Sequence, residues 1–269
     1  MRLVSFNPYR SIGVPGVRYI KPEMVFKHRE EIAEADWILF PEYWQVNFLV
    51  YGLKKRIFPN INTYHLGHDK VEMTRAFWAV CPENTPYTQI LASTDANIEQ
   101  VLDEFTFPFV TKEVRNSMGR GVFLIENKKD FLEYAQKNSI LYVQEYLPID
   151  RDLRIVYLGD KVITAYWRIG AEGQFHNNVS RGGSISFDDI PEEAIRLVEK
   201  VARKLGINHA GFDVAEVDGH YYFLEFNHMF GNQALLEKKI PVGRLIYEYL
   251  QSQSIPPREP DKPLIPRAS

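Results

Sequence analysis

Three oxygen-bearing side chains near the end of the chain have the types and spacing of a metal site. Asp213 lies in the apolar run at residues 211–217, and Glu225 and Asn227 lie in the apolar run at residues 220–227. Residues two apart on a strand share a face, so Glu225 and Asn227 point the same way. Two carboxylates and an amide oxygen suit Mg²⁺, or Mn²⁺ in its place, and Mg²⁺ usually shares its coordination with nucleotide phosphates.

This metal site makes a demand on the hairpin that carries it. With a two-residue turn at Asp218 and Gly219, Asp213 would face Leu224, and Glu225 would point to the other side of the sheet. A three-residue loop with Gly219 as a left-handed bulge brings Asp213 opposite Glu225. The metal interpretation therefore predicts a bulged turn, and the alternative is a solvated hairpin whose acids face water.

A second group of residues has the composition of a phosphate-binding loop. Lys112 precedes a turn that contains Ser117, Gly119 and Gly121 and ends at Val122, between two expected strands. Glycines let backbone N–H groups approach a phosphate closely. No GK[ST] follows and no helix receives the loop, so it is not a Walker P-loop. The alternative is a glycine-containing hairpin without a ligand.

The apolar run at residues 140–145 ends in Gln144, Glu145, Tyr146 and Leu147. The backbone of such a strand edge can bind an adenine, with Glu145 directed at the ribose or the amino group. The alternative is an ordinary strand end.

A fourth group is basic and consists of Arg154, Arg168, Arg181 and the nearby Asn178. An arginine that faces inward from a strand needs an anion as its partner. A salt bridge to Asp150 or Asp152 would satisfy any single arginine. For the set, a triphosphate is the more economical partner.

The elements expected to position these residues indicate an α/β (α+β) architecture. Residues 1–67 alternate as β-α-β-α-β, with helices near 22–35 and 42–55, which is typical of a short parallel α/β domain. The remaining boundaries define a lobe at residues 68–146, a second lobe with the metal site at 147–254, and a proline-rich tail at 255–269. Gly159 is expected to begin a two-residue turn, Asp69 to cap a helix and Gly206 to end one.

The composition restricts the class of partner. The 269 residues are 45% hydrophobic and 25% charged with a net charge of −3, so there is no general electrostatic case for nucleic acid. The single cysteine, Cys81, excludes an internal disulfide and fits a reducing compartment. No apolar run reaches transmembrane length, and Arg2 leads into a short strand. We therefore expect a cytoplasmic protein without a membrane partner, and a homo-oligomer remains open.

Taken in order, these motifs resemble the ATP-grasp superfamily and, within it, the RimK-like carboxylate–amine ligases. The motifs are K-x-x-x-x-S-x-G-x-G-V, QEYL, D-x-R, N-x-x-R-G-G, G-x-D and L-E-x-N, within residues 68–251. The resemblance implies two α+β lobes that hold ATP between them. ATP would contact Lys70, Lys112, a lid at residues 117–122, the strand end from Gln144 to Leu147, Asp152 and Asn178, while Arg154, Arg168 and Arg181 would act on the phosphoryl group or the acceptor carboxylate.

The sequence departs from the family pattern at two places. Asn116 stands where the lid motif often has glycine. Phe230 stands where the family usually has a proline beside the acceptor pocket, three residues after Asn227.

The implied reaction forms an amide from a carboxylate and an amine. ATP phosphorylates the carboxylate to an acylphosphate with release of ADP, and the amine then displaces phosphate. The substrates would be small molecules or a protein or peptide terminus. Two alternatives remain, a kinase-like phosphotransferase and an ATP-binding module without turnover. Hydroxylamine trapping distinguishes a ligase from a phosphotransferase, because only an acylphosphate yields a hydroxamate. ADP release with candidate acids distinguishes a ligase from a module without turnover.

Overall fold

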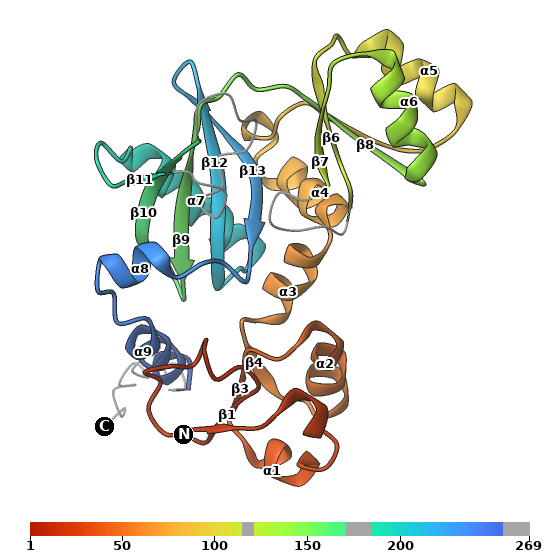
Figure 1. Cartoon of the computed structure of the whole chain (residues 1–269). Coiled ribbons are helices and arrows are strands. Elements are labelled where there is room, and N and C mark those ends of the chain that lie inside the picture. Colours follow the sequence, from red (N-terminus) through yellow and green to blue (C-terminus); the bar gives the residue numbers. More distant parts are fainter. Residues whose placement is uncertain (115–120, 171–183, 255–269) are drawn as a thin grey trace, which may run out of the picture.

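Three sheets follow one another along the chain in the computed structural model, which describes residues 1–114, 121–170 and 184–254. Figure 1 shows the N-terminal sheet below two larger sheets that stand side by side. Helices α3 (Ile61–His68) and α4 (Lys70–Val80) connect the lower part to the upper parts. Asp69 separates these helices, and its side chain accepts hydrogen bonds from the backbone N–H groups of Val71 and Glu72, as the sequence predicts.

The N-terminal sheet is parallel, with strand order β2-β1-β3-β4, and confirms the predicted short α/β unit. Its elements are β1 (Leu3–Ser5), β2 (Val17–Tyr19), the 3₁₀ turn Pro22–Met24, α1 (Arg29–Glu34), β3 (Trp37–Leu39), α2 (Tyr43–Asn47), the π-helical turn Phe48–Gly52 and β4 (Arg56–Phe58). The predicted helices were too long. Strand β2 was not predicted, because this edge strand is mostly exposed and has no apolar alternation that would reveal it.

The central sheet is antiparallel, with strand order β5-β8-β6-β7. Its elements are the 3₁₀ turn Pro82–Asn84, β5 (Thr88–Ala92), α5 (Asp95–Glu104), β6 (Phe109–Lys112), β7 (Val122–Ile125), α6 (Lys128–Lys137) and β8 (Ile140–Glu145). Helices α5 and α6 cover one face of this sheet and share a separate core with it. The edge strand β5 is a second strand that the sequence interpretation missed.

The C-terminal sheet has the order β11-β10-β9-β12-β13. Its elements are β9 (Arg151–Leu158), β10 (Lys161–Ile169), β11 (Ser184–Ser186), α7 (Glu192–Leu205), β12 (His209–Val217), β13 (His220–Asn227), α8 (Gln233–Glu237) and α9 (Val242–Ser254). Gly159 and Gly206 have φ values of 71° and 65°, so the predicted hairpin turn and helix end both use left-handed glycines.

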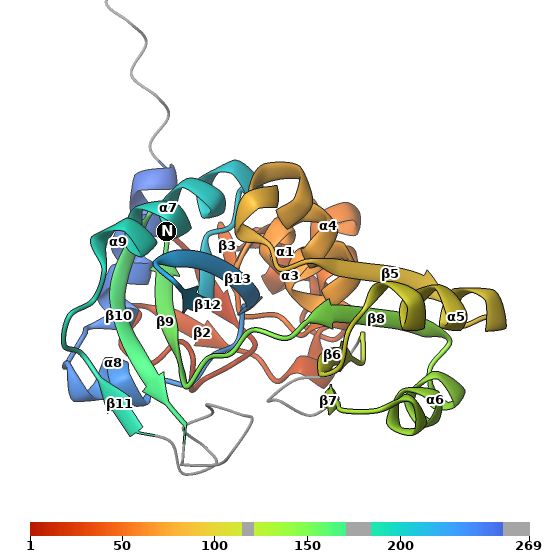
Figure 2. The same ribbon diagram turned by 90° about the horizontal axis from the view of Figure 1, so that it is seen from above.

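The two faces of the C-terminal sheet differ in what covers them. One face packs on α7 and on Met73 and Phe77 of α4, and Figure 2 shows these two helices on the same side of the sheet. The opposite face carries the charged side chains described below. Helix α9 packs against the N-terminal sheet, where Ile246 and Leu250 share a core with Trp37.

Candidate active site

The hairpin of β12 and β13 brings the predicted metal ligands together. Asp213 lies opposite Glu225, and Gly211 lies opposite Asn227. The predicted pairing is therefore present, but the predicted turn is wrong. The turn has two residues, Asp218 and Gly219, both left-handed with φ of 50° and 78°. The extra residue is Leu224, inserted farther along β13 between the partners of Asp213 and Val214.

The sequence contains a signal for this bulge. Tyr221 and Phe223 point into the core with the period of a regular strand, and the next core residue is Phe226, three positions later. The three-residue step between the buried residues Phe223 and Phe226 therefore indicates the bulge in β13, whereas Gly219 in the turn does not.

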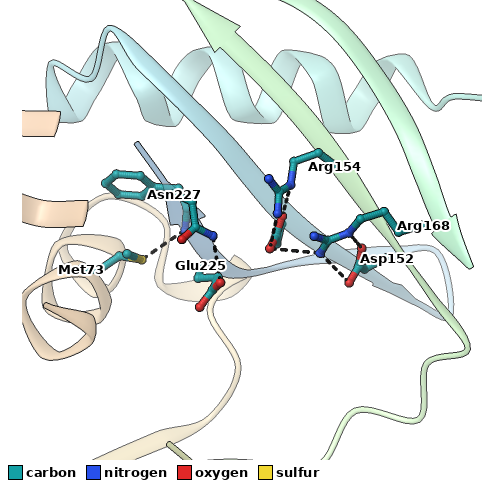
Figure 3. A network of polar contacts seen from close by, with 8 residues as sticks. Met73, Asp152, Arg154, Arg168, Glu225 and Asn227 are labelled. Atoms are coloured by element: carbon teal, nitrogen blue, oxygen red, sulfur yellow. Dashed lines mark hydrogen bonds and ion pairs between the residues drawn. The ribbon is translucent and has the colours of Figure 1, made fainter. Parts of the chain in front are cut away.

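Arg154, Arg168, Asp152 and Asp213 form a buried charged network on the face of the C-terminal sheet that is opposite α7 (Figure 3). Arg154 donates from Nε and Nη2 to both carboxylate oxygens of Asp213, the second bond at 3.0 Å. Arg168 donates to Asp152 at 2.6 and 2.8 Å, and its Nη2 lies 3.0 Å from Asp213 Oδ2. The two positive charges of the arginines offset the two negative charges of the aspartates, which lowers the free-energy cost of burying these groups.

The partners of the two strand arginines are carboxylates of the same sheet. Arg168 forms the predicted salt bridge to Asp152, whereas Arg154 pairs with Asp213, a carboxylate that was predicted only as a metal ligand. Although burial lowers it, the attraction of Asp213 and Asp152 raises the pKa of Arg168 above its ordinary value. Contact of these arginines with a phosphoryl group remains a prediction.

Glu225 and Asn227 are the more accessible donors of the predicted metal site. Asn227 Nδ2 donates to Glu225 Oε1 at 2.9 Å (Figure 3), which leaves the amide oxygen of Asn227 as the atom suited to a cation. Asp213 is buried and anchored by the arginines. The donor types and their placement fit Mg²⁺, and within the described residues no cluster of three His, Cys, Asp or Glu side chains fits a metal ion.

Two lysines lie near these acids, since the charges of Lys70, Glu225 and Asp213 all act on Lys112. Lys70 begins α4 and Lys112 ends β6, and both are buried. The pKa of Lys112 is lowered to about 8, chiefly because the group is buried; the carboxylates of Glu225 and Asp213 oppose this shift, and the positive charge of Lys70 adds to it. Two ammonium groups placed near each other in a desolvated site attract anions, and a polyphosphate is a suitable ligand for them.

The predicted adenine edge lies at the end of β8. Gln144 is buried and donates to the Thr88 hydroxyl at 2.8 Å, while Glu145 Oε1 accepts from the backbone N–H of Tyr87 at 2.6 Å. Tyr146 and Leu147 follow the strand in the segment that leads to β9. Glu145 is therefore tied to β5, and a contact with ribose would have to use its other oxygen.

The predicted lid is described only at its end. Gly121 has a left-handed φ of 74°, its carbonyl accepts from the backbone N–H of Glu113, and Val122 pairs with Lys112 across β6 and β7. The predicted residues Ser117, Gly119, Asn178 and Arg181 lie outside the described residues, as does the proline-rich tail.

An aromatic wall borders the charged network toward the N-terminal sheet. Phe230 is buried and stacks on His209 with a centroid distance of 4.9 Å. A Cβ on Gly211 would lie 3.1 Å from Phe230 Cγ and 2.8 Å from Arg154 Nη1, so only glycine fits between them. Arg10 lies over the Phe230 ring at 5.9 Å. Arg10 was not predicted as a site residue, although an arginine in the loop after the first strand of a parallel sheet is a signal in itself.

Two facing lobes with opposed lysines and carboxylates define an ATP-grasp fold, and the comparisons agree. The model of the RimK-like ATP-grasp domain matches residues 75–250. The chain belongs to this family. A crystal structure of a RimK domain ATP-grasp protein from Sphaerobacter thermophilus is similar, with a TM-score of 0.71 and 13% identity over 93% of this chain and 99% of that chain. That likeness shows the fold alone.

The sequence relatives are named as ligases. The chain is 31% identical over 165 residues to a "Probable alpha-L-glutamate ligase" of Chromohalobacter salexigens, which covers 58% of this chain and 54% of the relative. It is 30% identical over 148 residues to a "Ribosomal protein bS6--L-glutamate ligase" of Escherichia fergusonii, covering 53% and 49%. The chain thus spans about half the length of the curated relatives that it matches. No helix in the described part of the chain is long and apolar enough to cross a membrane.

Proposed function

We propose that the protein is an ATP-dependent ligase that joins a carboxylate to an amine through an acylphosphate. The observation that supports it most directly is that Lys112 of the central sheet is buried near the carboxylates of Glu225 and Asp213 on the C-terminal sheet, with the buried Lys70 beside it. Such a site holds a polyphosphate on one side and the cation that accompanies it on the other. Family membership and the names of the relatives agree with this activity.

In the proposed reaction the chain positions and neutralises charge. Lys70 and Lys112 bind phosphate oxygens, and Mg²⁺ held by Asp213, Glu225 and Asn227 would supply further charge neutralisation between the phosphates. Arg154 and Arg168, held in place by their carboxylate partners, present guanidinium N–H groups to the migrating phosphoryl group.

The bonds balance without a nucleophilic side chain. A carboxylate oxygen of the acid attacks the γ-phosphorus and ADP leaves. The nitrogen of the amine then attacks the acyl carbon, inorganic phosphate leaves, and the amine loses a proton to water or phosphate. Glutamate is the first amine to test, because the relatives are named glutamate ligases. A peptide or protein acceptor is the second class to test.

The test is ADP release with a panel of acids and amines, together with hydroxylamine trapping. We expect acid-dependent ADP release and a hydroxamate, which an acylphosphate yields and a phosphate ester does not. Glu225→Gln should lower turnover at least about 100-fold, because an electrostatic group at the reacting phosphates is lost. Glu216→Gln is the matched control, since Glu216 lies toward the turn of the same hairpin opposite Tyr221.

Two outcomes would contradict the proposal. One is a stable phosphorylated product without any hydroxamate, which would favour a phosphotransferase. The other is an unchanged rate in Glu225→Gln. Asp213 is the poorer test of turnover, because removing its charge leaves two buried arginines without a full partner and destabilises the fold by roughly 3–5 kcal/mol.

A further inference from the structure

The strand order of the N-terminal sheet defines a binding crevice. The chain runs from β1 to one side, where β2 lies, and then returns to place β3 on the other side of β1. In open parallel sheets, ligands bind outside the carboxyl ends of the strands where the strand order reverses. Here that point lies between the loop after β1, which carries Arg10, and the loop after β3, which begins at Phe40.

Arg10 is a half-buried cation that donates a hydrogen bond to a neutral side chain. Its Nη1 donates to Asn232 Oδ1 at 3.1 Å, and within the described residues no carboxylate lies within ion-pair distance of it. Burial lowers the pKa of Arg10, and the group that opposes this shift is the phenol of Tyr64. Desolvating a guanidinium without an anion is costly, so the position is unfavourable unless a ligand supplies the charge.

The groups around Arg10 are aromatic or neutral. His209 is buried and its pKa is lowered, chiefly because of burial, while His228 is half-buried. Tyr64 donates its hydroxyl to the Pro41 carbonyl at 2.6 Å and is therefore engaged. Phe40 has a left-handed φ of 48°, which is strained for a bulky residue and is the kind of conformation that collects at binding sites.

Phe230 connects this crevice to the charged network. The Arg10 guanidinium lies over its ring, and its Cγ lies against Gly211 beside Arg154. Gly211 and Asp213 are two positions apart on β12, a spacing of roughly 7 Å. Through Phe230 and Gly211, Arg10 is therefore connected to the strand that carries Asp213.

We propose that Arg10 binds a carboxylate of the substrate that is not consumed in the ligation, and thereby selects anionic substrates. This inference rests on the proposed function and names the substrate class of that site. Asn232 holds Nη1, so the Nε and Nη2 edge remains suited to a bidentate carboxylate. The nucleotide phosphates have their own cations in Lys70 and Lys112, so Arg10 is not needed for them.

The spare carboxylate belongs either to the acid or to the amine, and isosteric probes distinguish these sources. L-Glutamate, L-glutamine and L-isoglutamine present both carboxylates, the α-carboxylate alone or the side-chain carboxylate alone. Glutarate presents two carboxylates without an amine, and butyrate presents one. Binding of each probe is measured by calorimetry, with and without Mg²⁺ and a non-hydrolysable ATP analogue.

The variants are Arg10→Gln, Arg10→Lys and Asn232→Asp. Arg10→Gln should weaken binding of the preferred probe at least about tenfold, and Arg10→Lys should restore part of the loss. Asn232→Asp places a carboxylate on Arg10 and should weaken the same probe. Arg18→Gln is the matched control, because Arg18 is an exposed arginine of the same sheet that pairs with Glu31.

Binding of the ATP analogue is the readout that separates the two proposals. Equal probe affinity in wild type and Arg10→Gln, or no binding of any probe to the wild type, overturns the assignment of Arg10. Loss of probe affinity in Arg10→Gln with unchanged analogue binding supports it. Absence of analogue binding to the wild type refutes the proposed function, while the Arg10 assignment is still decided by the probe affinities.

Discussion

At the scale of single residues, Asp213 holds the site together as well as serving as a proposed metal ligand. Its carboxylate accepts from Arg154 and lies 3.0 Å from Arg168, so it fixes the direction of both guanidinium groups. A guanidinium that is already oriented loses little freedom when it meets a phosphoryl group. The same carboxylate therefore connects stability and the proposed catalysis, which is why Glu225 is the better residue for testing turnover.

His209 gives a residue-scale prediction on pH. The pKa of His209 is lowered to about 3, chiefly because the ring is buried and also because of the positive charge of Arg10. The unfolded chain takes up the proton near pH 6.5 and the folded chain only near pH 3, so the stability due to the neutral ring is complete above pH 6.5 and is lost as the pH falls toward 3. In His209→Gln this loss is absent.

We therefore expect the difference in unfolding free energy between wild type and His209→Gln to shrink by roughly 1.4 kcal/mol for each pH unit below 6.5. Urea unfolding at pH 7.5, 6.5 and 5.5 measures it. His220→Gln, which changes an exposed histidine, should show a constant difference. A constant difference for His209→Gln as well would mean that His209 is charged in the folded protein.

At the scale of elements, the contact between α9 and the loop after β1 controls the position of Arg10. Gly243 is buried in the first turn of α9 and meets the backbone of residues 12–14. A Cβ at Gly243 would lie 2.7 Å from Val14 N and closer still to the backbone of Ile12 and Gly13. Backbone cannot move aside as a flexible side chain can, so the loop and the helix must separate.

Gly243→Ala should thus destabilise the protein by about 1–3 kcal/mol through overpacking. Because the displaced loop carries Arg10, this variant should also weaken binding of the anionic probe while leaving binding of the ATP analogue unchanged. Thermal unfolding and calorimetry measure the two effects. Gly52→Ala serves as the control, since its Cβ would meet only Phe48 at an ordinary 3.9 Å. Equal behaviour of the two variants would contradict the prediction.

At the scale of the whole molecule, the N-terminal sheet and the C-terminal sheet share a core and the central sheet has its own. Helix α9 contributes Ile246 and Leu250 to a cluster that also holds Trp37 of the N-terminal sheet and Leu158 of β9. The core around α5 and α6 contains none of these residues. The Arg10 crevice and the charged network are therefore on one unit, and the lysine Lys112 and the adenine edge are on another.

Leu250→Ala tests this division. Leu250 is fully buried, so its truncation should cost about 2–5 kcal/mol. We expect hydrogen exchange to speed up together in β1, β3, β9 and α9, because they depend on one core. Leu141→Ala, an equally buried leucine of the central core, should speed exchange in the central sheet instead. Faster exchange confined to α9 in Leu250→Ala would show that the sheets do not share a cooperative core.

Local features of this protein were determined by the sequence alone. Asp69 as a helix cap and Gly159 and Gly206 as left-handed residues depend on a few neighbouring atoms, and the sequence predicted all three correctly. The pairing of Asp213 with Glu225 was also predicted, because both carboxylates must lie on one face of the sheet to reach the same metal ion.

Only the tertiary structure decided where the bulge falls, which short segments become edge strands, and what each arginine meets. The bulge at Leu224 follows from the need to bury Phe223 and Phe226 on one face, and edge strands depend on a neighbour elsewhere in the chain. Arg10 and Asn232 are 222 residues apart and meet because two sheets pack on a shared core. Short-range sterics and hydrogen bonds can be inferred from adjacent residues, whereas such contacts follow from the burial of whole faces.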